Sequence, residues 1–268
     1  MPKIVSWNLA EAGGARPLAW EFLQRSLNPD LALLQEARVP QGVPRGRVVC
    51  RPSGIAGRDG SRRPWGSAIV ALNDAIEITP IGLAEGWWRN GGMGLAPIDA
   101  VSRGHVAIAR VKLGDLEFTA ISAYGLIEFG YSSGTMLRLI ADLEPLFDDR
   151  QFGDKVLLAG DWNIGTWWTE SDSKYARREG AILDLLGAYD LIDCLDQFLP
   201  SDRGRLPNCA CDSEECRHIH THKKAGSDVA YMDDYVFATA GLVKAAAAAT
   251  PWDWEGSPSD HLPLVATV

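Results

Sequence analysis

The stretch that decides the fold is Lys155-Val156-Leu157-Leu158-Ala159-Gly160-Asp161-Trp162-Asn163. Its continuous apolar run indicates a strand buried on both faces, and the polar residues that follow lie at the carboxyl end of that strand. Leu31-Ala32-Leu33-Leu34-Gln35-Glu36 has the same form and places Glu36 at the tip of a second buried strand. A carboxylate in such a position is costly to bury unless it is paired or binds a metal. Both strand ends are therefore candidate functional positions.

Similar patterns continue on either side of these two stretches. Short β-type runs predict further strands, and apolar residues at helical spacing predict helices. The expected strands cover residues 3–9, 66–72, 106–111, 116–124, 231–238 and 262–268, and the expected helices begin near 18 and cover about 135–147 and 178–188. Strands in both halves separated by single helices predict an α/β protein with two sheets packed face to face and helices outside.

Two further expectations concern how these strands are arranged. Because no helical pattern separates 66–72, 106–111 and 116–124, we expect these three strands to pair consecutively as antiparallel neighbours. The five alanines at 245–249 have helical propensity, but they lie between two strand-like runs, which favours an extended segment. Residues 75–104 give no legible pattern.

The composition is that of a folded protein with a large core. The chain has 268 residues, of which 46% are hydrophobic and 23% charged, and no Ser/Gly-rich linker divides it. We expect one domain over residues 1–268. The first residues do not resemble a secretory signal and no apolar run is long enough to span a membrane, so we expect a cytoplasmic protein without membrane insertion. The sequence leaves the oligomeric state open.

The formal net charge of −9 argues against a large basic face that would gather phosphate backbones non-specifically. It does not exclude a nucleic-acid substrate, because metal sites are themselves acidic. Arg58, Arg62 and Arg63 form a local basic cluster that could supply the positive field.

Polar residues recur where apolar strand runs end. If those strand ends meet, their carboxylates, amides and one imidazole form a concave cluster of the kind in which ligands bind. The segments are, in chain order, Trp7-Asn8, Gln35-Glu36, Gly160-Asp161-Trp162-Asn163, Asp233-Asp234-Tyr235 and Ser259-Asp260-His261. Each segment alone is weak evidence for such a site, whereas the five segments in this order are strong evidence for one.

That order resembles the endonuclease/exonuclease/phosphatase superfamily, which includes apurinic-site DNA repair endonucleases, pancreatic-type deoxyribonucleases, sphingomyelinases and inositol phosphate phosphatases. The resemblance runs from Ser6-Trp7-Asn8 through Leu34-Gln35-Glu36 and Arg103-Gly104 to Ser259-Asp260-His261-Leu262-Pro263. It implies a four-layered α/β sandwich, in which two mixed sheets are flanked by helices. It also implies a metal-dependent phosphoesterase.

The resemblance further implies a metal site with oxygen ligands. Glu36 would be the principal ligand of Mg²⁺ or Mn²⁺, helped by Asn8, and Asp260 would complete the metal environment or support the neighbouring histidine. Repair endonucleases carry an acidic residue two positions after the first asparagine, but Ala10 stands here and Glu11 follows it. This departure puts in doubt both metal binding by that loop and membership of the repair branch.

The resemblance also implies roles for the catalytic residues. Asp161 would orient or deprotonate the attacking water, and Asn163 would hold the phosphate or that water. His261 would stabilise charge on the phosphate, with Asp234 fixing its tautomer. Tyr124 stands where the family has a histidine or a tyrosine that contacts the phosphate. Taken alone, Asn8 or Tyr124 could equally be a satisfied turn or core residue, and Asp233 a solvated neighbour.

A second constellation lies in a Cys/His-rich insertion at 205–224. It reads Cys209-x-Cys211-x₄-Cys216-x-His218-x-His220-x-His222, a donor set that selects zinc, although the spacing is not that of a common zinc finger. Cys209, Cys211, Cys216 and His218 are the candidate ligands of a structural Zn²⁺. The alternatives are a polar loop with incidental cysteines, or an arm whose His220 or His222 contacts substrate phosphate.

These observations lead to one preferred function and two alternatives. The preferred function is Mg²⁺-dependent hydrolysis of a phosphodiester, with nucleic acid as the expected substrate. A phosphatase or phosphodiesterase that acts on a lipid or small-molecule phosphate is the nearest enzymatic alternative. A non-catalytic module that binds nucleic acid or protein through the Cys/His insertion is the alternative from another class.

Overall fold

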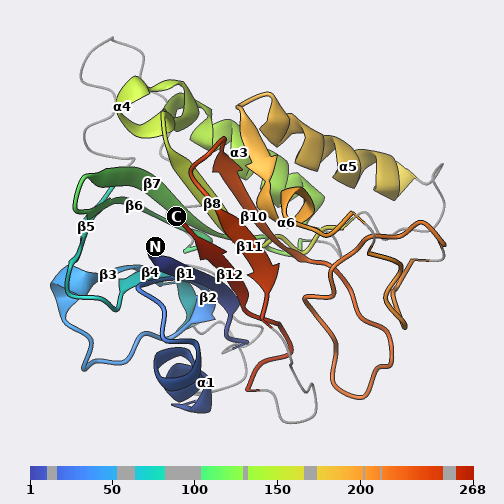
Figure 1. Cartoon of the computed structure of the whole chain (residues 1–268), viewed down its shortest axis with the longest axis horizontal. Coiled ribbons are helices and arrows are strands. Elements are labelled where there is room, and N and C mark those ends of the chain that lie inside the picture. The colour runs from blue at the N-terminus through green and yellow to red at the C-terminus, as the bar shows by residue number, and fades with distance from the viewer. Residues whose placement is uncertain are drawn as a thin grey trace.

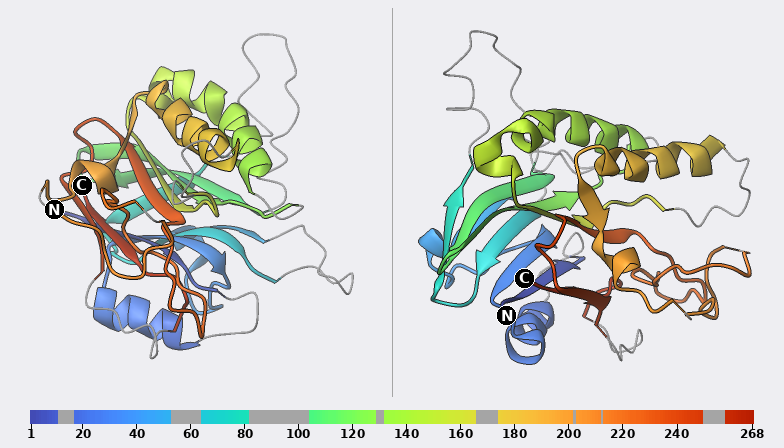
Figure 2. Two further views of the ribbon diagram at one scale, coloured as in Figure 1. Left: turned by 90° about the vertical axis from the view of Figure 1, so that its right-hand side faces the viewer. Right: turned by 45° about the horizontal axis from the view of Figure 1, so that its top comes forward.

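A computed structural model describes residues 1–10, 17–52, 64–81, 104–128, 132–165, 174–201, 203–211, 213–249 and 258–268. These residues form two mixed six-stranded sheets that pack face to face, with helices on the outer faces (Figures 1 and 2). In Figure 1, α1 lies below the first sheet and α3, α4 and α5 lie above the second. The expected α/β sandwich is confirmed.

The first sheet contains both chain termini. Its strand order is β11-β12-β1-β2-β4-β3, and only β1 and β2 pair in parallel. The strands are β1 (Lys3–Asn8), β2 (Leu31–Ala37), β3 (Val48–Pro52), β4 (Gly66–Ala71), β11 (Ala245–Ala248) and β12 (Leu264–Thr267).

The second sheet repeats this plan. Its order is β5-β6-β7-β8-β10-β9, and β7 and β8 form its parallel pair. The strands are β5 (Ile76–Pro80), β6 (Val106–Leu113), β7 (Leu116–Tyr124), β8 (Val156–Asp161), β9 (Leu191–Asp193) and β10 (Asp234–Thr239).

Helices connect the strands of each parallel pair. A helical segment, α1 (Pro17–Phe22) continued by the π-helical turn η2 (Leu23–Leu27), joins β1 to β2. The helices α3 (Ser133–Asp148) and α4 (Arg150–Gly153) join β7 to β8. The described residues also form the helical segments η3 (Arg45–Arg47), α5 (Lys174–Gly187) and α6 (Cys194–Gln197). Within the described residues, no helix is long and apolar enough to cross a membrane.

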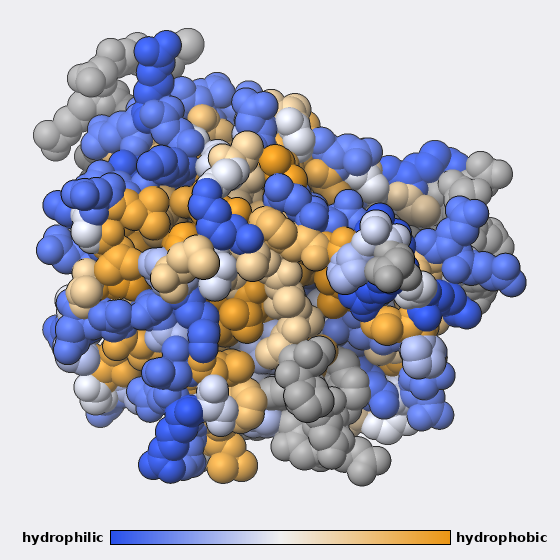
Figure 3. Space-filling model, in the orientation of Figure 1, coloured by the Kyte–Doolittle hydropathy of each residue, from blue (hydrophilic) through white to orange (hydrophobic). Residues whose placement is uncertain are grey.

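The core explains why β2 begins with four apolar residues, Leu31–Leu34. Leu31 and Leu33 belong to the core between the sheets, whereas Ala32 and Leu34 belong to the core beneath α1. Successive side chains of a strand point to opposite faces, so a strand covered on both sides needs apolar residues at every position. Figure 3 shows hydrophobic residues along the middle of the molecule, where the sheet edges lie, and hydrophilic residues over the helices above.

The structure corrects one expectation about pairing. The strands at 106–113 and 116–124 pair as antiparallel neighbours, as expected, but β4 pairs with β2 and β3 in the other sheet. The alanine run is extended, as expected, and forms β11. Arg58, Arg62, Arg63, Glu11 and Arg103 lie outside the described residues.

Candidate active site

The candidate site lies where the carboxyl ends of the two parallel strand pairs meet. β1 ends at Asn8 and β7 ends at Tyr124, while β2 carries Glu36 and β8 ends at Asp161. Residues 6, 8 and 161 are buried, and Tyr124 pairs with Asp161 in the strand register. Each sheet therefore contributes one carboxylate and one further polar side chain to the same region.

The side chain of Asn8 links the two sheets. Its Nδ2 donates to Glu36 Oε1 at 3.3 Å and to Asp161 Oδ2 at 2.8 Å, and its Oδ1 accepts from the backbone N–H of Ala10 at 2.8 Å. One fully buried amide thus holds two carboxylates on facing strands close together.

The backbone at Glu36 is held in an unfavourable conformation. Glu36 has a φ of 46°, and the pairing of β2 with β4 shifts register between Leu34 and Ala37. A β-bulge of this kind redirects a side chain, and a non-glycine residue in the left-handed region costs on the order of 1–3 kcal/mol. Asn163 also has a positive φ, 50°. Strained residues of this kind cluster at functional sites.

Asp161 reaches its position because Gly160 precedes it. A Cβ at residue 160 would lie 1.8 Å from the carbonyl oxygen of Ala123, so only glycine allows β8 to approach β7 there. Asp161 Oδ1 then accepts from the backbone N–H of Asn163 at 2.9 Å, and Oδ2 accepts from Asn163 Nδ2 at 3.1 Å. Asn163 Nδ2 also donates to the Gly125 carbonyl at 3.0 Å.

His261 forms a buried pair with Asp234. Its Nδ1 lies 2.9 Å from Asp234 Oδ2, and its Nε2 faces Asp161 Oδ2 at 3.7 Å. The backbone is fixed as well, because Trp7 Nε1 donates to the His261 carbonyl at 2.8 Å. Ser259 Oγ accepts from the His261 N–H at 3.1 Å and donates to the Asn8 carbonyl at 2.7 Å.

The electrostatics of this cluster favour a proton or a cation within it. Burial raises the pKa of Asp161 well above its usual range, although the imidazole of His261 opposes the shift. Burial alone would lower the pKa of His261, but the carboxylates of Asp234 and Asp161 outweigh it and raise that pKa well above its usual value. At neutral pH the imidazole is therefore a cation whose Nε2–H can be donated.

A second histidine lies against the first, and sequence reasoning gave it no such partner. The rings of His222 and His261 stack with centroids 4.4 Å apart and planes 10° apart. His222 Nδ1 lies 2.9 Å from Asp233 Oδ2, so Asp233 is paired and buried, not a solvated neighbour. The doublet Asp233-Asp234 was the available signal: each aspartate orients one histidine.

The remaining expected residues occupy different places. Tyr124 is buried and makes an edge contact with the ring of Trp65, with centroids 5.5 Å apart. Asp260 Oδ2 lies 3.9 Å from His222 Nε2. Its Oδ1 is buried and, within the described residues, no hydrogen-bond donor reaches it. His220 does not belong to the cluster of Asp161, Asp234 and His261. Burial and then the guanidinium of Arg203 lower its pKa to about 4.

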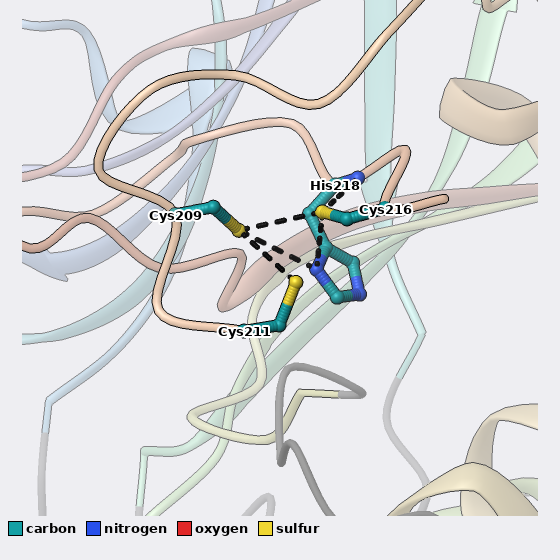
Figure 4. A group of neighbouring side chains, drawn as sticks. All are labelled: Cys209, Cys211, Cys216 and His218. Carbon is teal, nitrogen blue, oxygen red and sulfur yellow. Dashed lines mark hydrogen bonds between the residues drawn. The ribbon is translucent and has the colours of Figure 1, made fainter. Parts of the chain in front are cut away.

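The donor set of the site suits a hard divalent cation. Glu36 and Asp161 both accept from the amide of Asn8, Asp260 has a buried oxygen that no donor of the described residues reaches, and the side chains of Asp161, Asp234 and His261 have ligand atoms within 4.8 Å of one another. Oxygen ligands with retained water are what Mg²⁺ and Mn²⁺ prefer. The Cys209, Cys211, Cys216 and His218 side chains form a separate cluster (Figure 4).

Comparisons with known proteins agree with this fold and show the family of the chain. The sequence matches the Endonuclease/Exonuclease/phosphatase family over residues 5–261. The fold is similar to the endonuclease domain of TRAS1, a telomere-specific non-LTR retrotransposon, with a TM-score of 0.60 and 18% identity over 100% of this chain and 98% of that one. It is also similar to the Xenopus laevis APE2 catalytic domain, with a TM-score of 0.67 and 16% identity over 99% and 91% of the two chains. A comparison with curated proteins found no match.

Proposed function

Because the chain belongs to the endonuclease/exonuclease/phosphatase family, we propose that it is a Mg²⁺-dependent hydrolase that attacks a phosphodiester in nucleic acid. The observation that carries this proposal is the arrangement around Asp161. Its Oδ2 lies 2.8 Å from Asn8 Nδ2, which also contacts Glu36, and 3.7 Å from Nε2 of the His261–Asp234 pair. A base, a phosphate-stabilising cation and a metal-binding carboxylate thus surround one point.

Glu36 is the carboxylate that we assign to the metal, with Asp260 as a further oxygen ligand. When bound, a divalent cation supplies stabilisation of the negative charge that develops on the phosphate oxygens. Asn8 donates its amide nitrogen to Glu36 and Asp161, so in this arrangement it positions both carboxylates. The strained φ of Glu36 supports the assignment, because such a conformation persists where the side chain direction matters.

Asp161 is the residue that we assign to the attacking water. Burial makes its carboxylate a stronger base than one in solvent, which suits it to accept the proton of a water molecule. The side chain and backbone N–H of Asn163 and the amide of Asn8 hold this carboxylate in one orientation. Asn163, whose amide lies beside the same carboxylate, would hold the phosphate or the water in line.

His261 is the residue that we assign to the charge on the phosphate. Asp234 accepts the Nδ1 proton, so the protonated ring directs its Nε2–H away from Asp234 and towards the site. A donor that is already oriented and buried stabilises a transition state more than a mobile one in water. Tyr124, at the end of β7 beside Asp161, would contact the same phosphate through its hydroxyl.

Nucleic acid is the substrate class to test first. The TRAS1 domain, whose fold is similar over the whole of this chain, is named an endonuclease domain, which supports nucleic acid as the substrate class. The net charge of −9 means that any basic surface for a polynucleotide must be local.

The proposal is tested by hydrolysis assays with Mg²⁺ against single- and double-stranded nucleic acids, inositol phosphates and sphingomyelin. We expect nucleic acid to be cleaved, and Asp161→Asn to lose the activity while Asp115→Asn, an isosteric change at an exposed turn, keeps it. If only the lipid or small-molecule phosphates are cleaved, the substrate is not nucleic acid but belongs to that class. Hydrolysis that survives chelation and Asp161→Asn would disprove the mechanism, and no hydrolysis of any ester would favour a binding module.

A further inference from the structure

The segment between α6 and β10 contains a cluster that the proposed hydrolysis does not use. Cys209 Sγ lies 3.6 Å from Cys211 Sγ and 3.4 Å from Cys216 Sγ. His218 Nδ1 lies 3.6 Å from Cys209 Sγ and 3.2 Å from Cys216 Sγ. Figure 4 shows the four side chains pointing toward one another, and all four ligand atoms lie within 4.8 Å of each other.

These separations are close to those of a tetrahedral zinc site. With Zn–S bonds of about 2.3 Å and Zn–N bonds of about 2.0–2.1 Å, tetrahedral geometry places ligand sulfurs about 3.8 Å apart and sulfur and nitrogen about 3.6 Å apart. The distances that involve Cys209 and Cys216 agree with these values to within about half an ångström. Three thiolates and one imidazole are a donor set that selects zinc over Mg²⁺.

A hydrogen-bond donor and a positively charged side chain lie beside the cluster. The backbone N–H of His218 donates to Cys216 Sγ at 3.4 Å, and Arg205 Nη2 donates to the Cys211 carbonyl at 2.5 Å. The three cysteines are at most 8% exposed. Burial nevertheless raises the pKa of Cys209 and Cys216, so a bound cation is what would hold these sulfurs as thiolates, the forms that bind metal.

The part of the segment that carries the cysteines has little apolar core of its own. Within the described residues, the three cysteines form an apolar cluster of their own, separate from the two main cores. Ile219 and Met232 of the same segment pack into the main core, but among the described residues from 203 to 218 only the three cysteines are buried, and a bound ion would hold this part in place.

We propose that Cys209, Cys211, Cys216 and His218 bind one Zn²⁺, and that this ion fixes the segment that presents His222 to the active site.

Backbone pairing shows how the ion would act on the site. Four residues after His218, the N–H and carbonyl of His222 both pair with Tyr231 on one side, at 3.1 and 2.8 Å, and residue 222 bridges to His261 on the other. The Leu262 N–H donates to the Thr221 carbonyl at 2.6 Å. The zinc cluster is tied to the same elements, because the Ala210 N–H donates to the Ala230 carbonyl at 3.0 Å. The ring of His222 is thereby held on the ring of His261.

Metal content is the first test, and it needs no substrate. Protein purified in excess Mg²⁺ should contain about one zinc per chain, and protein loaded with Co²⁺ should show the visible and charge-transfer absorption of a tetrahedral cobalt thiolate. Cys216→Ser should lose most of the zinc, whereas Cys50→Ser, a half-buried cysteine of β3 outside the cluster, should keep it. Zinc-free protein with reduced thiols, or with a disulfide between two of these cysteines, would overturn the proposal.

The second test uses wild-type protein, so it does not depend on how well a variant folds. A soft-donor chelator that removes zinc in the presence of excess Mg²⁺ should lower the Tm and increase proteolytic cleavage within 198–233. An unchanged Tm and cleavage pattern after zinc loss would show that the ion does not stabilise the segment.

A third test examines the link to His222 and rests on the proposed hydrolysis. Zinc removal should lower hydrolysis more in the wild type than in His222→Ala, which has already lost the contact with His261. Equal losses in both backgrounds would disprove the link. Failure of the proposed hydrolysis would leave the zinc content and the Tm shift unaffected, so the two proposals are separable.

Discussion

At the scale of residues, the imidazole of His261 lies between two buried carboxylates, 2.9 Å from Asp234 Oδ2 and 3.7 Å from Asp161 Oδ2. An imidazolium in this place is useful only if its ring is oriented, and orientation is the contribution of Asp234. The two residues should therefore act as one unit in catalysis.

We predict that Asp234→Asn lowers kcat by roughly 10²-fold or more, the usual contribution of a positioned acid or base. Adding this change to His261→Ala should cost little more, because the oriented ring is already absent. Steady-state kinetics of the two single variants and the double variant measure this. Independent, multiplicative losses would contradict a functional pair.

Glu36 offers a prediction that separates stability from activity. Its φ of 46° is unfavourable for glutamate but common for asparagine. Glu36→Asn should lose hydrolysis while the free energy of unfolding without metal stays equal or rises by up to about 1 kcal/mol. Denaturant unfolding in EDTA measures the change, and Glu36→Gln, which keeps the strain, is the matched control. A clear loss of stability in Glu36→Asn would mean that the conformation is not strained.

At the scale of elements, the approach of β8 to β7 depends on one glycine. The Cβ of Gly160→Ala would lie 1.8 Å from a backbone oxygen, whereas a Cβ at Gly180, inside α5, would meet nothing within 4 Å. We predict that Gly160→Ala destabilises the protein by at least about 2 kcal/mol and impairs Asp161, while Gly180→Ala stabilises it by about 0.5–1 kcal/mol. Thermal and denaturant unfolding compare the two. Similar effects would argue against the close approach.

The start of α6 makes stability depend on pH. Asp193 accepts from the backbone N–H groups of Leu195 and Asp196, yet burial raises its pKa to about 6. The folded state therefore holds this proton more tightly than the unfolded state, so stability is lost as pH rises towards 6, by roughly 3 kcal/mol at most. Asparagine keeps the cap without ionising.

We therefore predict that Asp193→Asn is more stable than the wild type at pH 8 and no more stable at pH 4. Chemical denaturation of both proteins at the two pH values measures the difference. A constant difference, or a gain at pH 4 alone, would contradict the effect of burial on this carboxyl.

The elements that could be predicted from sequence are those whose burial leaves a pattern. β2 and β8 each begin with four apolar residues, at 31–34 and 156–159, because both faces are covered there. β3 and β5 were missed because they lie at sheet edges, where a strand needs less apolar surface, as the exposed residues of β5 illustrate. β4 was assigned the wrong partners because burial does not specify which strand lies alongside.

The candidate site, too, was only partly predictable from the sequence. Asp161 at the end of β8, Asp234 at the start of β10 and His261 just before β12 lie in one buried cluster. The three alternate histidines of the insertion do not share one face: His218 joins the cysteines, His220 lies near Arg203, and His222 stacks on His261. Their segment is irregular, so spacing could not predict its path.

At the scale of the whole molecule, the two sheets meet at a pair of carboxylates. Glu36 belongs to the first sheet and Asp161 to the second, and only the amide of Asn8 lies between them among the described contacts. Burial of Asp161 disfavours its negative charge, and a cation shared by Asp161 and Glu36 would offset that cost. Metal binding should therefore stabilise the whole fold, not only the site.

We predict that Mg²⁺ at about 100 times its Kd adds about 2.7 kcal/mol to the free energy of unfolding, which raises the Tm by roughly 5–10 °C for a chain of this size. Glu36→Gln should abolish most of this rise and should itself be no less stable than the wild type in EDTA, because it removes a half-buried charge and keeps the size of the side chain. Asp115→Asn, at an exposed turn, should keep the full rise. Calorimetry with and without Mg²⁺ measures each value. If the Mg²⁺-induced rise in Tm persists in Glu36→Gln, the cation binds elsewhere. Glu36 would then not be a ligand of the metal that stabilises the fold.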